Sequence, residues 1–404
     1  MKIESGTYLI PKGFRATAVQ ADIKGKPSNK EDLMMIVADR DCMAAGVFTK
    51  NSAKSGAVLI SQAHLSSCTI RGMVGISGNA NACVPNALSD AEEITVLAGD
   101  FIGVPKEQIL LAMTGKIGVP MQMEAVKRGF QKMSPPTTDQ FESAARAIMT
   151  SDTFPKVAST TIQIGRSKVN IMGISKGNGM IHPNMATTLS FVMTDARIQK
   201  ELLQRALSDA TLDTFNMIDV DSDMSTNDTI LVLASGEAGN EEIADLSSES
   251  YILFFDALRE FLRDLAKQVA GDAEGSKKLL ICNLKGAGTK EEARALARSV
   301  VSSIRFKASM GGRCNYWGRI PASMGATGIP FDLDQMDIHI RYEGGCFPVF
   351  LRGAALEIQD ELTDQMTESS QITISIQLQE GQQEAEAYGC DLQPIYVENT
   401  ANYG

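Results

Sequence analysis

The pair Ala186-Thr187 lies where a chain could cut its own backbone. It ends the segment KGNGMIHPNMAT at residues 176–187, which is rich in Gly, Asn and Pro and leads directly into the apolar residues 188–193. A turn-rich stretch that feeds a buried strand is a place where backbone strain can be stored. The Thr187 hydroxyl would attack the carbonyl of Ala186, convert the amide to an ester, and let water release a new N-terminal threonine.

Such a threonine carries its own base. Its α-amine, with a pKa of ~7.7–8.0 in model peptides, would take the proton of the neighbouring hydroxyl, so no histidine or aspartate is required. The chain has only three histidines, which suits this chemistry. The pattern also fits an interpretation without chemistry, in which residues 185–191 enter a core strand while Thr188 and Ser190 face solvent.

Composition excludes several classes of function. Lys plus Arg number 38 and Asp plus Glu 49, a net charge of −11, whereas a protein that grips nucleic-acid phosphates needs a basic face. No run of about 18 apolar residues is present to span a membrane. The acidic, weakly apolar start of the chain resembles neither a signal peptide nor a transit peptide. We therefore expect a cytoplasmic protein with no nucleic-acid partner and no membrane partner.

The cysteines and histidines argue against a metal site. The seven cysteines are odd in number, scattered and without a CxxC pair, which favours reduced thiols over disulfides or a metal cluster. They are Cys42, Cys68, Cys83, Cys282, Cys314, Cys346 and Cys390. The histidines, at positions 64, 182 and 339, are too dispersed for a zinc site that sequence alone could reveal.

Short strands and helices alternate around Thr187. Apolar runs predict strands at residues 33–37, 57–60, 74–76, 188–193 and 372–378, and a hairpin over residues 157–174. Helical spacing predicts helices over residues 138–149, 199–212 and 251–269. Capping-box patterns, SDAE at 89–92 and TKEE at 289–292, predict helices to residue 97 and to residue 301. The mixture predicts an α/β or α+β fold, with no internal repeat and no interdomain linker.

The segment KGNGMIHPNMATTLSF at residues 176–191 closely resembles the signature of the ArgJ family, the bifunctional ornithine acetyltransferases and glutamate N-acetyltransferases. Ten further blocks resemble that family in the same order along the chain, namely GFRA at 13–16, AGVFT at 45–49, SGNANAC at 77–83, TG at 114–115, MTSDT at 149–153, FN at 215–216, DMSTNDT at 223–229, DAEG at 272–275, WGR at 317–319 and YGCDL at 388–392. The resemblance therefore covers nearly the whole chain.

This resemblance implies a fold, a processing step and a reaction. The fold is a DmpA/ArgJ-like arrangement of mixed sheets layered with helices, plus a smaller C-terminal α/β lobe. Cleavage between Ala186 and Thr187 gives an α chain, residues 1–186, with the oxyanion-hole half, and a β chain, residues 187–404, with the nucleophile and the substrate-binding half. Thr187 then moves acetyl from N2-acetyl-L-ornithine to L-glutamate in a ping-pong cycle of arginine biosynthesis. The family needs no metal and no cofactor, implies an α2β2 assembly, and leaves acetyl-CoA open as a further donor.

The resemblance also assigns roles to single residues. Thr187 matches the nucleophile, and Thr114 and Gly115 match the pair that stabilises the oxyanion. A fixed hydroxyl and a backbone N–H suit that role, because one such donor stabilises the tetrahedral intermediate by roughly 3–4 kcal/mol. Thr150 and Lys176 match substrate-binding residues, and a lysine suits the α-carboxylates of both substrates.

Two more substrate-binding positions lie in the second half of the chain. Glu274 matches a glutamate that would pair an amino group of ornithine or glutamate. The tail of the family resembles YVxINxxYxT, in which an Asn and a terminal Thr or Ser bind substrate, whereas residues 396–404 here read YVENTANYG. Aligning both tyrosines puts Thr400 where the asparagine belongs and leaves Asn399 one residue away. We expect an extended tail, in which a slip of one residue turns a side chain to the other face.

Further departures lie at Met113 and Lys116 beside the Thr-Gly pair, at Ala273 in place of a glycine, and at CNY, residues 314–316, before Trp317. They keep two alternatives open within the same chemistry. One is a paralogue that applies the threonine to a different acylated amine, and the other is an N-terminal-threonine amidohydrolase. A third alternative, from another class, is a homologue retained as a structural or binding protein.

Overall fold

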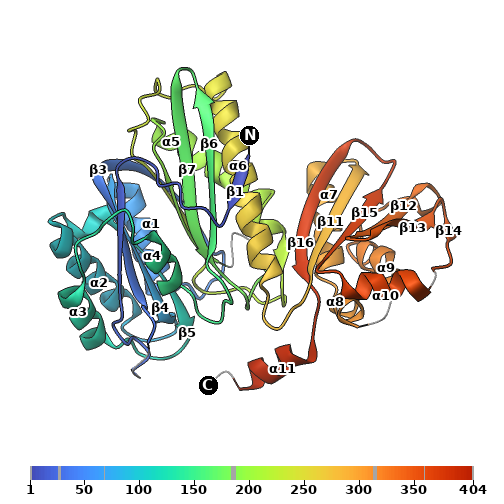
Figure 1. The fold of residues 1–404 in the computed structure, drawn as a ribbon, viewed down its shortest axis with the longest axis horizontal. Coiled ribbons are helices and arrows are strands. Elements are labelled where there is room, and N and C mark those ends of the chain that lie inside the picture. The colour runs from blue at the N-terminus through green and yellow to red at the C-terminus, as the bar shows by residue number, and fades with distance from the viewer. Residues whose placement is uncertain are drawn as a thin grey trace. The chain divides into compact units, whose positions relative to one another are not determined.

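The computed structural model describes residues 2–25, 29–67, 69–182, 188–312, 316–358 and 360–402. The chain forms two compact units, and it passes between them several times (Figure 1). The first unit comprises Met1–Gly177, Pro183–Leu212 and Met224–Leu265, and the second comprises Asn178–His182, Asp213–Asp223 and Ala266–Gly404.

The first unit is built around one mixed sheet. Its strand order is β1-β6-β7-β8-β10-β3-β4-β5, with β2 also paired to β3. The pairs β8/β10 and β4/β5 are parallel, and the other pairs are antiparallel. The strands are β1 (Ile3–Ser5), β2 (Phe14–Val19), β3 (Leu33–Phe48), β4 (Ile70–Asn79), β5 (Ile109–Lys116), β6 (Lys156–Ile164), β7 (Ser167–Lys176), β8 (Leu189–Thr194) and β10 (Thr229–Ala234).

Strand β3 separates two apolar cores. Leu33 and Met35 belong to one buried cluster, which also holds side chains of the helices after β4 and β5. Met34 and Ile36 belong to the other, which also holds side chains of β7 and β8. Because successive residues of a strand point to opposite faces, a continuous apolar run can serve both cores. The helices of this unit are α1 (Gly56–Ser67), α2 (Ala87–Ile102), α3 (Met123–Lys132), α4 (Phe141–Ala147), α5 (Lys200–Leu212) and the first part of α6 (Glu249–Gly271).

The second unit has its own mixed sheet, whose strands β11 to β16 are drawn from orange to red in Figure 1. Its order is β14-β13-β12-β15-β11-β16-β9. The strands are β9 (Ile218–Asp219), β11 (Leu279–Ala287), β12 (Asp337–Tyr342), β13 (Gly345–Leu351), β14 (Ala354–Ala355), β15 (Gln371–Gln377) and β16 (Gln383–Cys390). The helices are α7 (Lys290–Val301), α8 (Ile304–Gly311), α9 (Arg319–Gly325), α10 (Asp360–Glu368) and α11 (Pro394–Ala401). Helix α7 packs on β11 and β16. The expected mixed α/β architecture with a smaller C-terminal lobe is confirmed.

Several local expectations are also confirmed. Strands β6 and β7 form the predicted hairpin, and α5 and α6 cover the predicted helical ranges to within two residues. At the start of α7 the Thr289 hydroxyl accepts the N–H of Glu292, while the Glu292 carboxylate accepts the N–H of Thr289. This reciprocal pair is the capping box that the sequence predicts.

Two expectations in the first third of the chain are wrong. Residues 57–60 form the first turn of α1 and no strand, with the Val58 N–H donating to the Ser55 hydroxyl at 3.3 Å. A short apolar run does not distinguish a strand from a buried helix segment. The SDAE pattern at 89–92 makes no capping box, because α2 already begins at Ala87 and the Ser89 hydroxyl donates back to the Asn86 carbonyl.

The tail also differs from expectation. Residues 394–401 form helix α11, with Pro394 at its first position. The backbone N–H that a proline lacks would have no partner within the helix there. Neighbouring side chains are therefore separated by about 100° around a helix axis instead of lying on opposite faces of a strand. None of the helices within the described ranges has the length and apolar character of a membrane span.

Candidate active site

Thr114 and Gly115 lie at the end of β5, in parallel register with the end of β4. Thr114 pairs with Ser77 and Gly115 with Gly78. Gly115 has φ +139°, and a Cβ placed on it would lie 2.3 Å from the carbonyl carbon of Gly78. Both the backbone angle and the close approach therefore require glycine at position 115, which fixes the direction of the peptide groups around it.

A buried asparagine fastens this end of β5. The Asn227 side-chain amide donates to the Met113 carbonyl at 3.0 Å and to the Ala80 carbonyl at 2.5 Å. One side chain from the loop before β10 thus holds the residue before Thr114 and the residue after β4. Met113 is itself fully buried in the apolar cluster beneath α2 and α3, so this departure from the family pattern fills the core.

Lys176 ends β7, and its ammonium reaches the Thr114 side chain. The Nζ donates to the Thr114 Oγ1 at 3.3 Å. An ammonium has only donors, so the Thr114 hydroxyl must accept this bond, and its own proton remains able to point at a third group. The structure therefore brings together two residues that the sequence assigns to different roles.

A buried carboxylate lies beside Lys176. The Asp152 Oδ1 accepts the Lys156 ammonium at 2.5 Å and the Gly177 N–H at 2.7 Å, while its Oδ2 accepts the Thr150 N–H at 3.0 Å. Burial opposes ionisation of Asp152, but the ammonium groups of Lys176 and Lys156 outweigh it and hold the pKa of the carboxyl well below its usual range. Burial lowers the pKa of Lys176, and the carboxylates of Asp152 and Asp228 oppose that shift.

Ala186 and Thr187, the expected cleavage site and nucleophile, lie outside the described residues. The residues that follow them are described. Thr188 and Ser190 are buried, and the Ser190 hydroxyl lies 2.8 Å from that of Ser175 on β7. The interpretation in which Thr188 and Ser190 face solvent is therefore wrong, because both side chains are buried.

In the second unit, Glu274 lies next to the tail helix. Its N–H donates to the Asn178 carbonyl at 2.7 Å, and the Asn399 side chain acts on its carboxylate, where it lowers the pKa. Burial and the negative charge of Asp221 raise the pKa of Glu274. The Thr400 side chain instead acts on Tyr396, one turn earlier in α11, where it partly opposes the rise in the pKa of the phenol. Of the two tail residues considered, Asn399 is thus the one that faces Glu274.

The loop that carries Glu274 explains one departure from the family pattern. Among the described residues, the position in this loop with positive φ is Gly275, at +73°, and not Ala273. A Cβ on Gly275 would lie 2.3 Å from the Cγ2 of Ile395 in α11. Ala273 is therefore an ordinary buried residue with no backbone strain, whereas Gly275 allows α11 to lie directly on the loop.

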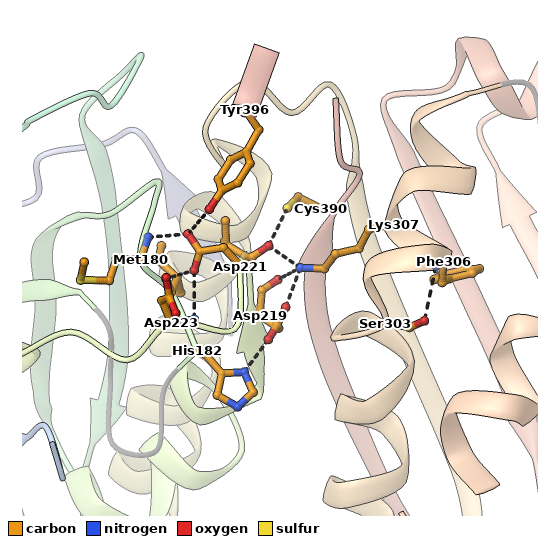
Figure 2. A network of polar contacts seen from close by, with 12 residues as sticks. Met180, His182, Asp219, Asp221, Asp223, Ser303, Phe306, Lys307, Cys390 and Tyr396 are labelled. Carbon is orange, nitrogen blue, oxygen red and sulfur yellow. Dashed lines mark hydrogen bonds and ion pairs between the residues drawn. The ribbon is translucent and has the colours of Figure 1, made fainter. Parts of the chain in front are cut away.

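Asp221 organises the segment that follows Lys176 and Gly177 in the chain. Its carboxylate accepts the N–H groups of Met180 at 2.6 Å and Ile181 at 2.8 Å, and Tyr396 points its hydroxyl at it from α11 at 3.4 Å (Figure 2). Burial and Asp221 raise the pKa of Tyr396 to about 12, so it stays a neutral donor.

A second carboxylate in the same view joins a lysine and a histidine. The buried Lys307 ammonium donates to the Asp219 Oδ1 at 2.6 Å and to the backbone carbonyls of Asp219 and Val220 (Figure 2). The His182 Nδ1 lies 2.5 Å from the other Asp219 oxygen. These contacts fasten β9 to α8 and to the segment that leads toward residue 183.

Lys307→Met should lower the free energy of unfolding by about 3–5 kcal/mol, because removing one partner of a buried ion pair leaves the other charge uncompensated. Urea denaturation followed by circular dichroism measures the loss. The matched control is Lys285→Met, since the Lys285–Glu384 pair is more than half exposed and an exposed pair contributes at most about 1 kcal/mol. Equal losses in both variants would contradict this account.

Comparison with known proteins identifies the family. Residues 15–404 match the ArgJ family over nearly the whole chain. The chain belongs to the ArgJ family. A relative from Symbiobacterium thermophilum, named arginine biosynthesis bifunctional protein ArgJ, is 39% identical over 401 residues, covering 99% of this chain and 98% of the relative. A relative of the same name from Caldanaerobacter subterraneus subsp. tengcongensis is 36% identical over the full length of both chains. The resemblance found in the sequence motifs is confirmed.

Two solved structures are similar to parts of this ArgJ chain. The structure of arginine biosynthesis bifunctional protein ArgJ from Bacillus halodurans is 36% identical, with a TM-score of 0.49, and the match covers 53% of this chain and 98% of that one. The ornithine acetyltransferase from Mycobacterium tuberculosis, solved with ornithine, is 28% identical with a TM-score of 0.40, covering 46% of this chain and 99% of that one.

Motif comparison did not single out several residues that organise this ArgJ chain. Asp152 lies inside the MTSDT block, but its role depends on Lys176, 24 positions later. Asp221 and Asp219 follow the FN block, and their partners come from α11 and α8. The one available signal is the density of acidic residues at 219–228, where a carboxylate must find a donor if it is buried. Within the described residues, no group of three or more His, Cys, Asp or Glu residues could hold a metal ion.

Proposed function

We propose that this ArgJ chain cleaves itself between Ala186 and Thr187 and then transfers acetyl from N2-acetyl-L-ornithine to L-glutamate through an acetyl-Thr187 intermediate. The single observation that best supports the proposal is the Lys176 ammonium donating to the Thr114 hydroxyl at the end of β5, where Gly115 tolerates no side chain. This contact supports the proposal, because a reaction on an N-acetylated amino acid would use a cation for the carboxylate and a nearby hydroxyl for the oxyanion.

The self-cleavage begins with the Thr187 hydroxyl. Its oxygen attacks the Ala186 carbonyl carbon, the hydroxyl proton passes to the Thr187 nitrogen, and the C–N bond breaks. This leaves an ester between Ala186 and the Thr187 side chain. Water hydrolyses that ester, which yields a carboxylate on Ala186, a free hydroxyl and a free α-amine on Thr187. The α chain, residues 1–186, and the β chain, residues 187–404, result.

The acyl transfer uses the new amine as its base. The α-amine of Thr187 takes the hydroxyl proton as the oxygen attacks the acetyl carbonyl of N-acetylornithine, and the ornithine amine leaves with that proton. The amine of glutamate then attacks acetyl-Thr187 and gives up a proton, which restores the hydroxyl and releases N-acetylglutamate. Thr114 Oγ1–H and the Gly115 N–H would stabilise the negative oxygen in both halves.

Substrate contacts follow from charge. Lys176 and Thr150 would bind the α-carboxylate that both substrates share. Glu274 and Asn399 would bind an amino group, with Asn399 rather than Thr400 assigned because the Asn399 side chain acts on the Glu274 carboxylate. We also propose a cytoplasmic α2β2 assembly that needs neither metal nor cofactor, which sedimentation of the purified, metal-free enzyme would test.

Intact-mass analysis tests the proposed reaction. After incubation with N-acetylornithine, the β chain should gain the mass of one acetyl group on Thr187, and glutamate should remove it as N-acetylglutamate. Acetyl that is lost to water at the same rate with or without glutamate would favour an amidohydrolase. A β chain that gains mass only from another acylated amine would favour a paralogue. Incubation with acetyl-CoA as the sole donor tests whether it can acetylate Thr187. If no donor adds mass to the β chain, the alternative of a structural or binding protein would be favoured.

The pH dependence of ornithine binding should report Glu274. Burial and Asp221 raise its pKa, so the carboxyl takes up a proton at a higher pH than an ordinary glutamate as pH falls. Only the carboxylate attracts an ammonium group, and the affinity for ornithine should therefore fall on the acid side, starting above the usual range of a glutamate. Calorimetric titration at a series of pH values measures this acid-side decrease in affinity, which we call the acid limb.

Two variants make the assignment specific. Glu274→Gln should bind ornithine weakly and without the acid limb. Asp221→Asn removes the neighbouring negative charge, so the pKa of Glu274 should fall and the limb should move to lower pH. An acid limb that stays in place in both variants would contradict the role of Glu274.

A further inference from the structure

We infer that Asp152 is a positioning residue for acyl transfer, which holds the Lys176 ammonium against Thr114 and fastens the backbone on both sides of it, and that Lys156 sets the charge balance of this arrangement. The inference deepens the proposed function and rests on it for the roles of Lys176 and Thr114. Asp152 would touch neither substrate nor nucleophile. It would act through Lys176.

The geometry places Asp152 at the centre of three chain segments. It accepts the N–H of Thr150 after α4, the ammonium of Lys156 at the start of β6, and the N–H of Gly177 directly after β7. Thr150 and Lys176 are the two residues assigned to the substrate carboxylate. One side chain thus fixes the backbone next to both of them, and its own charge faces the Lys176 ammonium.

The burial of this cluster is difficult to explain by stability alone. The side chains of Asp152 and Lys156 are both 0% exposed. A buried ion pair loses much of its Coulomb energy to desolvation, and apolar residues of similar volume often stabilise a fold equally well. A second ammonium, Lys176, placed beside the pair adds a further desolvation cost. The arrangement is explained if the Lys176 ammonium has to be held at a fixed position for function.

The charges around Lys176, together with its own, add up to zero. Asp152 and Asp228 are negative and Lys156 is positive, so Lys176 makes the sum of the four groups zero. Removing the charge of Asp152 would leave two buried ammonium groups with one carboxylate, and the pKa of Lys176 would fall further. Removing the charge of Lys156 would do the opposite. The two substitutions therefore act on Lys176 in opposite directions, although both break the same ion pair.

The consequence reaches Thr114 through one hydrogen bond. A charged Lys176 can only donate to the Thr114 Oγ1, which leaves the hydroxyl proton for the oxyanion. A neutral Lys176 can accept that proton instead, and the oxyanion then loses a donor. A neutral Lys176 also no longer attracts the substrate carboxylate. Loss of the Asp152 charge should therefore affect both KM and kcat.

Steady-state kinetics over a range of pH test the inference. With N-acetylornithine as the varied substrate, Asp152→Asn should lower kcat/KM at least tenfold at pH 8. It should also move the basic limb of the pH profile, the decrease in kcat/KM as Lys176 loses its proton, to lower pH. Lys156→Met should move the basic limb to higher pH. The double variant, with charge balance restored, should return the limb toward that of the wild type. The matched control is Glu142→Gln, which breaks the exposed pair with Arg146 and should leave the limb in place.

A merely structural role would give a different pattern. Both single variants would then lose activity in parallel, with no opposite movement of the limb, and the double variant would be the worst of the three. That result would overturn the inference. If Asp152→Asn fails to fold, Lys156→Met alone decides, because an unmoved or lowered limb contradicts the predicted rise.

A second measurement separates this inference from the proposed function. The ammonium of Lys176 can be titrated by NMR in protein carrying 13C-labelled lysine, with its signal identified from Lys176→Arg. Asp152→Asn should shift that titration to lower pH and Lys156→Met to higher pH, whether or not the enzyme turns over. A wild type that forms no acetyl-Thr187 while these shifts occur would refute only the proposed function. Unmoved titrations in an active enzyme would refute only the role of Asp152.

Discussion

Replacing Thr187 with alanine should leave one intact chain of 404 residues, whereas the wild type should separate into residues 1–186 and 187–404 under denaturing conditions. The methyl side chain of alanine has no oxygen to attack the Ala186 carbonyl, so the ester cannot form. The same substitution removes the nucleophile of the acyl transfer. We therefore expect complete loss of acetyl transfer along with loss of processing, measured by intact mass and by ornithine release.

Thr187→Ser is the matched control, because a serine keeps both a hydroxyl and, after cleavage, a free α-amine. It should still give two chains, with the second starting at serine. Terminal sequencing of the wild type should read two starts, Met1 and Thr187. A wild type with a single start at Met1 would rule out this mechanism.

Thr114→Val should slow formation of acetyl-Thr187 by about 10²–10³-fold, which is the usual cost of losing one oxyanion donor. Valine has nearly the shape of threonine, and Thr114 is only partly buried, so the β4/β5 register should persist. The rate is measured by rapid quenching and mass analysis of the β chain, counted over cleaved molecules only, so that slower processing does not distort the value.

Thr114→Ser keeps the hydroxyl and should retain most of the rate. The dissociation constant of ornithine should change much less than the acylation rate in Thr114→Val. The oxyanion donor acts on charge that exists only in the transition state, and Lys176 keeps its charge although it loses one acceptor. A Thr114→Val enzyme that acylates as fast as the wild type would remove Thr114 from the oxyanion site.

The sequence predicts best where a structure depends on neighbours along the chain. The β6/β7 hairpin, helices α5 and α6 and the capping box at Thr289 all form from local spacing. Residues 57–60 and the tail were assigned to the wrong structure because both are short, and a short segment takes its conformation from what covers it. Gly275, which lets α11 lie on the Glu274 loop, acts over 120 positions and has no local signal.

The candidate site divides in the same way. The family resemblance assigns Thr114, Gly115 and Lys176 to the site, yet nothing in their spacing shows that Lys176 donates to Thr114 across 62 positions. The same holds for Asp152. Its neighbours in sequence, Thr150 and Lys156, are within four residues, but the group that gives it a function is the ammonium at the end of β7. Contacts between distant strands are set by the sheet topology, which motifs do not encode.

Positions 273 and 275 differ in what they can accept, and this matters for redesign of acyl-group selectivity. Ala273 has an ordinary backbone and could be randomised among small residues, whereas any side chain at Gly275 would meet Ile395 and push α11, with Asn399, away from Glu274. A library aimed at new acceptor amines should therefore hold Gly275 and Ile395 constant and place its diversity at Glu274 and Asn399.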